Sequence, residues 1–217
     1  MRAGLNLRRH FPSKIFVLAI LLAIAGFASI FIYMGVYNIG ADVPHSKLIS
    51  STLAEMRERA VANHSRHVRP PADLEDPKRV AAGAALYNEM CTGCHLGPGL
   101  AKSELSQGLY PSAPELALGN DRSAAEQFWI IKHGVKMSGM PAWGKTHDDQ
   151  LIWNMVAFIR QLPELSPEQY KGAVANAPEG HEEMMEHMVG MGNSNQQHEP
   201  ASKQHTHAHE HGNERSH

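Results

Sequence analysis

The pentapeptide CTGCH at positions 91–95 constrains the fold of this chain more than any other feature. Cys91 and Cys94 are the only two cysteines among 217 residues, and His95 follows them directly. A disulfide across two intervening residues would close too small a loop to stabilise a domain much. A thioredoxin-like dithiol needs a βαβ setting and a structural zinc site needs four ligands, and the surrounding sequence supplies neither. The motif is instead typical of covalent haem attachment, in which both thiols bond the vinyl groups and the histidine faces the iron.

A second constraint is the apolar run Ile15–Tyr37, which carries no formal charge over 23 residues. As a helix it would be about 34 Å long, enough to cross a hydrocarbon core of about 30 Å. Basic residues, Arg8 and Lys14 among them, precede the run, and the next charged residue after it is Asp42. This distribution places the N-terminus in the cytoplasm. Because a cleaved signal peptide has only about 7–15 apolar residues, we predict a cytoplasmic segment at 1–14 and a transmembrane signal anchor at 15–37.

The remaining chain divides by composition into a stalk, a domain and a tail. Residues 38–75 form the predicted periplasmic stalk, in which Ser46–Arg66 has a helical composition and Pro70 and Pro71 end any helix. We favour a spacer over a docking helix for this segment. Residues 76–165 form the predicted domain. Residues 166–217 are polar and rich in Gly, Asn, Gln, His and Met, which is typical of a disordered tail.

Three helices and no strand are predicted within the domain. The first begins at Asp76, an N-cap followed by proline. The second covers about 123–133 and ends at Gly134, and the third covers about 148–161, with Thr146 as its expected N-cap. An all-α domain of about 90 residues has a thin core for folding without a staple. A haem would supply the missing apolar volume. The net charge of −2 gives no support for nucleic-acid binding.

If His95 is the fifth ligand of a haem iron, a sixth ligand is expected on the opposite side. Met140 in SGMPAWG is the preferred candidate. Thioether sulfur is a soft ligand, and a His/Met pair keeps haem iron low-spin at a raised potential. The following proline restricts the backbone at Met140, and the flanking glycines permit close approach to a flat macrocycle. Met137 is the nearest competitor, and His133 is a weaker one.

From about residue 76 to 162, the chain resembles the class I monohaem c-type cytochromes. Gly83, Tyr87 and Cys91 keep that family's spacing in the first helix, and Met140 stands at its axial position. The resemblance implies a small helical domain around one covalent haem c. This haem would be bound at Cys91 and Cys94 and ligated by His95 and Met140.

The resemblance also implies particular packing partners. Gly83 and Tyr87 should pack against the last helix, near Met155 and Phe158. A proline carbonyl after the motif should orient His95, with Pro111 and Pro114 as candidates. Tyr110 and Trp143 should line the haem pocket, whereas Trp129 and Trp153 are assigned to ordinary packing.

These features predict an electron-transfer protein rather than an enzyme, with no catalytic residue of its own. The leading hypothesis is a single-pass cytochrome of the bacterial inner membrane, with a periplasmic haem domain acting as a one-electron carrier in a respiratory chain. Its donor would be a dehydrogenase or a bc1-type complex, and its acceptor an oxidase or reductase. The alternative is a dedicated haem c subunit of one multisubunit dehydrogenase or oxidase.

The tail raises a further hypothesis, an added metal-binding segment. Imidazole suits zinc, nickel and Cu(II), and the tail's methionine thioethers suit Cu(I). A solvated polar tail without specific ligation is the competing interpretation. The candidate ligands alternate along the chain: His205, His207, His209 and His211.

Overall fold

The computed structural model describes residues 13–178, and in that range all regular structure is helical. The described chain forms two compact units, which meet in sequence between Met56 and Arg57. The fold class predicted from the sequence, an all-α domain preceded by one apolar helix, is confirmed.

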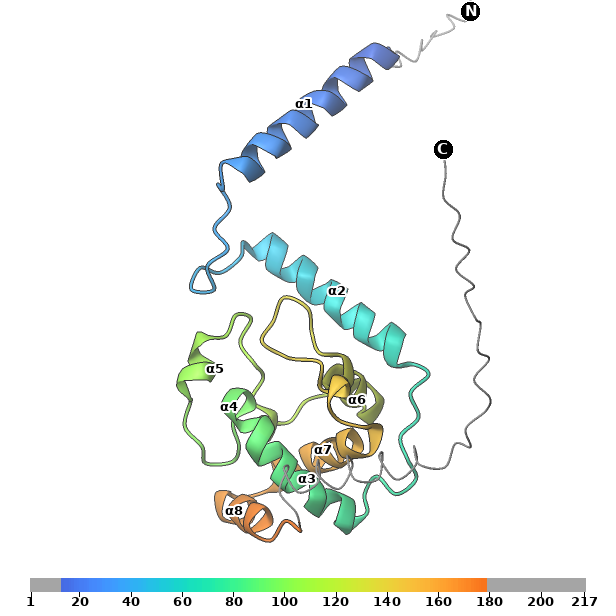
Figure 1. The fold of residues 1–217 in the computed structure, drawn as a ribbon, viewed down its shortest axis with the longest axis vertical. Helices are drawn as coiled ribbons and strands as arrows, with labels where there is room; N and C mark the ends of the chain where they lie inside the picture. The colour runs from blue at the N-terminus through green and yellow to red at the C-terminus, as the bar shows by residue number, and fades with distance from the viewer. Residues whose placement is uncertain (1–12, 179–217) are drawn as a thin grey trace, which may run out of the picture. The chain divides into compact units, whose positions relative to one another are not determined.

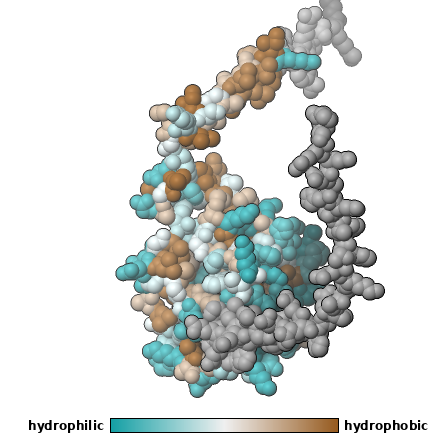
Figure 2. Space-filling model, in the orientation of Figure 1, coloured by the Kyte–Doolittle hydropathy of each residue, from teal (hydrophilic) through white to brown (hydrophobic). Residues whose placement is uncertain are grey.

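The first unit is dominated by α1 (Lys14–Tyr33), the one helix among the described residues that is long and apolar enough to cross a membrane. Ser13 caps it by accepting a hydrogen bond from the Phe16 amide at 3.2 Å. Its 20 residues span about 30 Å. Figure 2 shows its surface as mostly brown, which marks apolar side chains. The helix ends four residues before the predicted limit at 37, because Gly35 has a positive φ of 60°.

The core of the second unit is the crossing of α3 (Pro77–Met90) and α7 (Asp149–Gln161) (Figure 1). Asp76 caps α3 with Pro77 at the first helical position, as predicted. Gly83 lets the helices approach closely, since a Cβ there would lie 2.8 Å from the Phe158 Cβ. The Tyr87 and Phe158 rings pack 5.6 Å apart. The predicted packing of Gly83 and Tyr87 against the last helix is confirmed.

The third helix of the core, α6 (Ala124–His133), also packs on α7. Ser123 and Glu126 form a capping box, and Gly134 ends the helix with a φ of 67°. Phe128 stacks on Trp153 with ring centroids 4.1 Å apart, which agrees with a packing role for this tryptophan. Shorter elements complete the domain: α4 (Thr92–His95), α5 (Glu104–Gly108), η1 (Leu116–Leu118), η2 (Trp143–Lys145) and η3 (Leu162–Glu164).

One predicted helix cap is wrong. The N-cap of α7 is Asp148, whose carboxylate accepts a hydrogen bond from the Leu151 amide at 2.9 Å. Thr146 instead donates its hydroxyl to the Trp143 carbonyl at 3.3 Å and so closes η2. Both residue types make good caps, and Thr146 is already used by the preceding turn.

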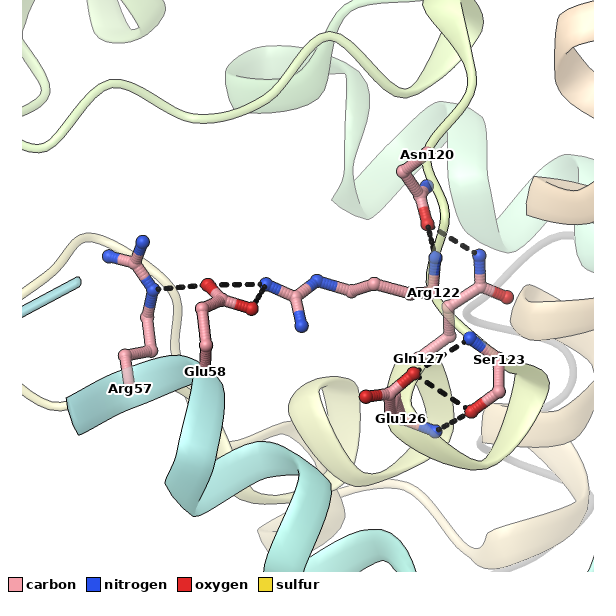
Figure 3. Close-up of polar contacts among 7 residues, drawn as sticks. All are labelled: Arg57, Glu58, Asn120, Arg122, Ser123, Glu126 and Gln127. Carbon is pink, nitrogen blue, oxygen red and sulfur yellow. Dashed lines mark hydrogen bonds and ion pairs between the residues drawn. The ribbon is translucent and has the colours of Figure 1, made fainter. Parts of the chain in front are cut away.

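The C-terminal half of α2 (Lys47–Ser65) lies in the second unit and makes side-chain contacts there, although the segment was expected to be a spacer. Glu58 accepts two hydrogen bonds from the Arg122 guanidinium, at 2.7 and 2.8 Å (Figure 3). The His64 ring stacks on Trp129 at 5.6 Å, and Val61 is only 1% exposed. The part of the predicted stalk from Arg57 to Ser65 is therefore a docked helix.

The segment after residue 166 begins with a helix, so the prediction of disorder is wrong for residues 167–175. Helix α8 (Pro167–Ala175) starts with a capping box between Ser166 and Gln169. Tyr170 anchors it, with 2% of the residue exposed. Ala173 and Val174 of the same helix also pack against the hydrophobic core. The candidate metal ligands His205, His207, His209 and His211 lie outside the described residues.

Candidate haem site

The CTGCH motif forms a helical turn directly after α3. Cys91 ends α3 and also precedes α4, and its carbonyl accepts hydrogen bonds from the amides of Cys94, at 3.1 Å, and His95, at 2.8 Å. Residues three and four apart share one face of a helix. The two thiols and the imidazole therefore belong to a common face. This shared face is the physical reason why two residues separate the cysteines of a haem-attachment motif.

The two thiols differ in environment. Cys91 is 7% exposed and belongs to the hydrophobic core, whereas Cys94 is half-buried. Burial raises the pKa of the Cys91 thiol to about 12, with a smaller contribution from Cys94. The attachment site is thus built into the core of the domain.

His95 is oriented by a main-chain acceptor. Its Nδ1–H donates a hydrogen bond to the Pro114 carbonyl at 2.8 Å. Burial lowers the pKa of His95, and the hydrogen bond to Pro114 acts in the opposite direction. The imidazole is therefore neutral at pH 7 and keeps its Nε2 lone pair for a metal. Of the two prolines that the sequence left open, the structure selects Pro114.

Three further hydrogen bonds fix the attachment turn, and none was foreseen from the sequence. The Tyr87 hydroxyl donates to the Leu96 carbonyl at 2.6 Å, and the Thr92 hydroxyl to the Asn88 carbonyl at 2.6 Å. The Ser103 hydroxyl donates to the Gly93 carbonyl at 2.5 Å. No local pattern predicts these partners, because each depends on how the chain returns to the motif.

Met140 lies in the loop between α6 and η2, which is closed by a hydrogen bond from the Val135 amide to the Met140 carbonyl at 3.1 Å. The Met140 amide donates to the Ser138 hydroxyl at 3.2 Å. Gly134 lets the backbone near Met140 pass close by, since a Cβ at Gly134 would lie 2.8 Å from the Met140 carbonyl oxygen. This closure holds the residue in a defined position.

The two candidate methionines face different surroundings. Met140 is half-buried and packs against the hydrophobic cluster that contains Cys91. Met137, in contrast, is 76% exposed and has a positive φ of 57°. His133, the weaker rival, is exposed and packs against Trp129 at a ring distance of 5.0 Å. The geometry favours Met140 as the residue that reaches the core.

The aromatic residues assigned to the pocket are half-buried. Trp143 packs against the same hydrophobic cluster as Met140 and meets His147 edge-on at 5.4 Å. Tyr110 is half-buried in the loop that leads to Pro114. Among residues 13–178, no group of three or more His, Cys, Asp or Glu side chains forms a candidate metal site.

The site fits a covalently bound haem. It offers two thiols on one helical face, a neutral imidazole with Nε2 available, and a half-buried thioether on a closed loop. Residues 78–159 match a family model described as cytochrome C oxidase, cbb3-type, subunit III. No significant match was found among curated proteins or among solved structures.

The matched segment covers less than half of the chain and includes nearly all of α3 and α7, the CTGCH turn and α6. The domain is a monohaem c-type cytochrome that carries covalently bound haem c. The chain is accordingly an electron-transfer protein with one apolar helix near its N-terminus. The resemblance and the cofactor predicted from the sequence are confirmed.

Proposed function

We propose that this chain is a membrane-anchored cytochrome that carries single electrons within a respiratory chain. The observation that carries the proposal is the hydrogen bond from His95 Nδ1 to the Pro114 carbonyl. It fixes the ring and its tautomer and leaves Nε2 as the iron ligand. Cys91 and Cys94 form the two thioether bonds.

Met140 is the proposed sixth ligand. Its half-buried side chain packs on the cluster that contains Cys91, and the hydrogen bonds of its loop hold its backbone. When bound, haem supplies one-electron redox chemistry whose potential depends on ligation, burial and hydrogen bonding. The chain's own residues orient the imidazole, present the thioether and exclude water from the core face of the attachment turn.

The proposed location is the bacterial inner membrane. Helix α1 is the single-pass anchor, and the basic residues before it favour a cytoplasmic N-terminus. The haem domain then faces the periplasm. Tethering at the bilayer raises the effective concentration of the domain near membrane partners.

The proposed partners are a donor dehydrogenase or bc1-type complex and an acceptor oxidase or reductase. A second candidate function is a dedicated haem c subunit of one such oxidoreductase. The family match favours this candidate, because the matched family is described as a subunit of an oxidase. Extraction in mild detergent followed by size-exclusion chromatography separates the two. A stable stoichiometric complex supports the subunit, and isolation of the cytochrome alone supports the free carrier.

The ligand set is tested by replacing each loop methionine in protein made with haem-maturation machinery. Met140→Ala should abolish the near-infrared sulfur-to-iron band of the ferric protein and lower the reduction potential. Met137→Ala is the matched control and should keep both, because its side chain is 76% exposed. Survival of the band in Met140→Ala would refute this ligand. Protein without any thioether-linked haem would refute the whole proposal.

A further inference from the structure

Helix α8 lies beyond the matched segment 78–159, yet it packs on α3 (Figure 1). Its Tyr170 is one of the hydrophobic core residues, with 2% of its surface exposed. Two chains of contacts lead from this side chain to opposite ends of the CTGCH motif.

The first chain reaches the beginning of the motif. The Tyr170 hydroxyl donates a hydrogen bond to the Asn88 side-chain oxygen at 3.0 Å. The carbonyl of Asn88 accepts from the Thr92 hydroxyl at 2.6 Å. Thr92 directly follows Cys91, so this series of contacts restrains the backbone between the two cysteines.

The second chain reaches the end of the motif. The Tyr170 ring meets Tyr87 edge-on, with centroids 6.5 Å apart at 86°, a favourable arrangement of two aromatic quadrupoles. The Tyr87 hydroxyl donates to the Leu96 carbonyl at 2.6 Å. Leu96 directly follows His95 and has a positive φ of 59°. A leucine holds this conformation only under restraint from its surroundings.

The chain after His95 lies directly against α8. A Cβ at Gly97 would come within 3.0 Å of the Tyr170 ring, and one at Gly99 within 2.7 Å of Pro167. Gly97 is buried, so the contact leaves no room for water between α8 and the loop at this position.

We infer that α8 clamps the haem-attachment turn and that Tyr170 is a positioning residue for His95. The inference rests on the proposed function, in which His95 binds iron. Ferric haem carries one more positive charge than ferrous haem, so a dry, rigid attachment turn disfavours the ferric form and raises the potential. Loosening the clamp should admit water and lower the potential.

Two variants of the full haem-loaded chain test this inference in a graded way. Tyr170→Phe removes only the hydrogen bond to Asn88, whereas Tyr170→Leu also removes the ring that supports Tyr87. Lys171→Gln is the control, because Lys171 is exposed on the same helix. Hydrogen–deuterium exchange over residues 91–99 and the midpoint potential are measured for each protein, with exchange in α6 as an internal reference.

Tyr170→Phe should speed exchange at 92–94 about tenfold, the size expected for losing one buried hydrogen bond. Tyr170→Leu should extend the effect to 96–99 and lower the potential by about 59 mV, a tenfold change for a one-electron couple. Exchange in α6 and every property of Lys171→Gln should stay unchanged. An unaltered potential in Tyr170→Leu would overturn the inference. That result is distinguishable from failure of the proposed function, which appears as absence of thioether-linked haem or of Met140 ligation.

Discussion

The close crossing of α3 and α7 predicts that Gly83→Ala lowers the stability of the domain. A methyl group at Gly83 would lie 2.7 Å from the carbonyl carbon of Asn154, 2.8 Å from the Phe158 Cβ, and closer still to the Asn154 carbonyl oxygen. Two of these three atoms are backbone, so no side-chain rotation can relieve the contact. The two helices have to separate.

The magnitude follows from two opposing effects. Replacing glycine by alanine within a helix stabilises it by about 1 kcal/mol. Overpacking a core typically costs about 1–3 kcal/mol and sometimes more. Here the clash is with main chain, and separation also loosens the Tyr87–Phe158 contact at 5.6 Å. We therefore expect a net loss of about 2 kcal/mol.

The measurement is guanidinium unfolding of the haem-loaded protein, followed by circular dichroism. Gly172→Ala is the matched control, because Gly172 lies inside α8 and a Cβ there meets nothing within 4 Å. The control should raise the unfolding midpoint, by up to about 1 kcal/mol of stability, while Gly83→Ala lowers it. If both variants were stabilised equally, α3 and α7 would not cross as closely as described.

Three other perturbations have defined outcomes. Glu58→Gln should cost about 0.2–1 kcal/mol in urea unfolding at low salt, and the difference should vanish at high salt, because its partner Arg122 forms a partly exposed ion pair. Asp73→Asn should lower stability at pH 7, because the hydrogen bond from Arg79 lowers the pKa of Asp73. That stability is lost as pH falls through the lowered pKa, so acid unfolding curves of variant and wild type should converge. Replacing His205, His207, His209 and His211 together by glutamine should weaken Cu(II) and Zn²⁺ binding in calorimetric titration. Unchanged binding would refute the hypothesis that the tail binds metal.

Local signals in the sequence were enough to predict the helix boundaries of the domain. The Asp76-Pro77 start, the helix start near residue 123 and the stop at Gly134 each depend on a few neighbouring residues. Thr146 failed as a cap because two suitable residues stand close together, and the turn before α7 uses one of them.

Long-range choices could not be read from the sequence in the same way. Pro111 and Pro114 are equivalent in local pattern, and only the path of the loop brings the Pro114 carbonyl to His95. Composition also failed to predict that two segments dock on the domain as helices, namely α8 and the C-terminal half of α2. In each, a few buried or stacked side chains decide the outcome, namely Tyr170 in α8 and Val61 with His64 in α2.

These two additions hold the segment between His95 and α6 near both of its ends. Helix α8 contacts the segment at Gly97 and Gly99 at the beginning, and α2 binds Arg122 at the other end through Glu58 (Figure 3). Pro114, which orients the proposed axial histidine, lies between these two restraints. An electron carrier benefits from ligands that move little when the charge on iron changes, and outer hydrogen bonds supply that rigidity. We therefore expect the elements outside the matched family segment to affect the position of His95, although neither element supplies a proposed iron ligand.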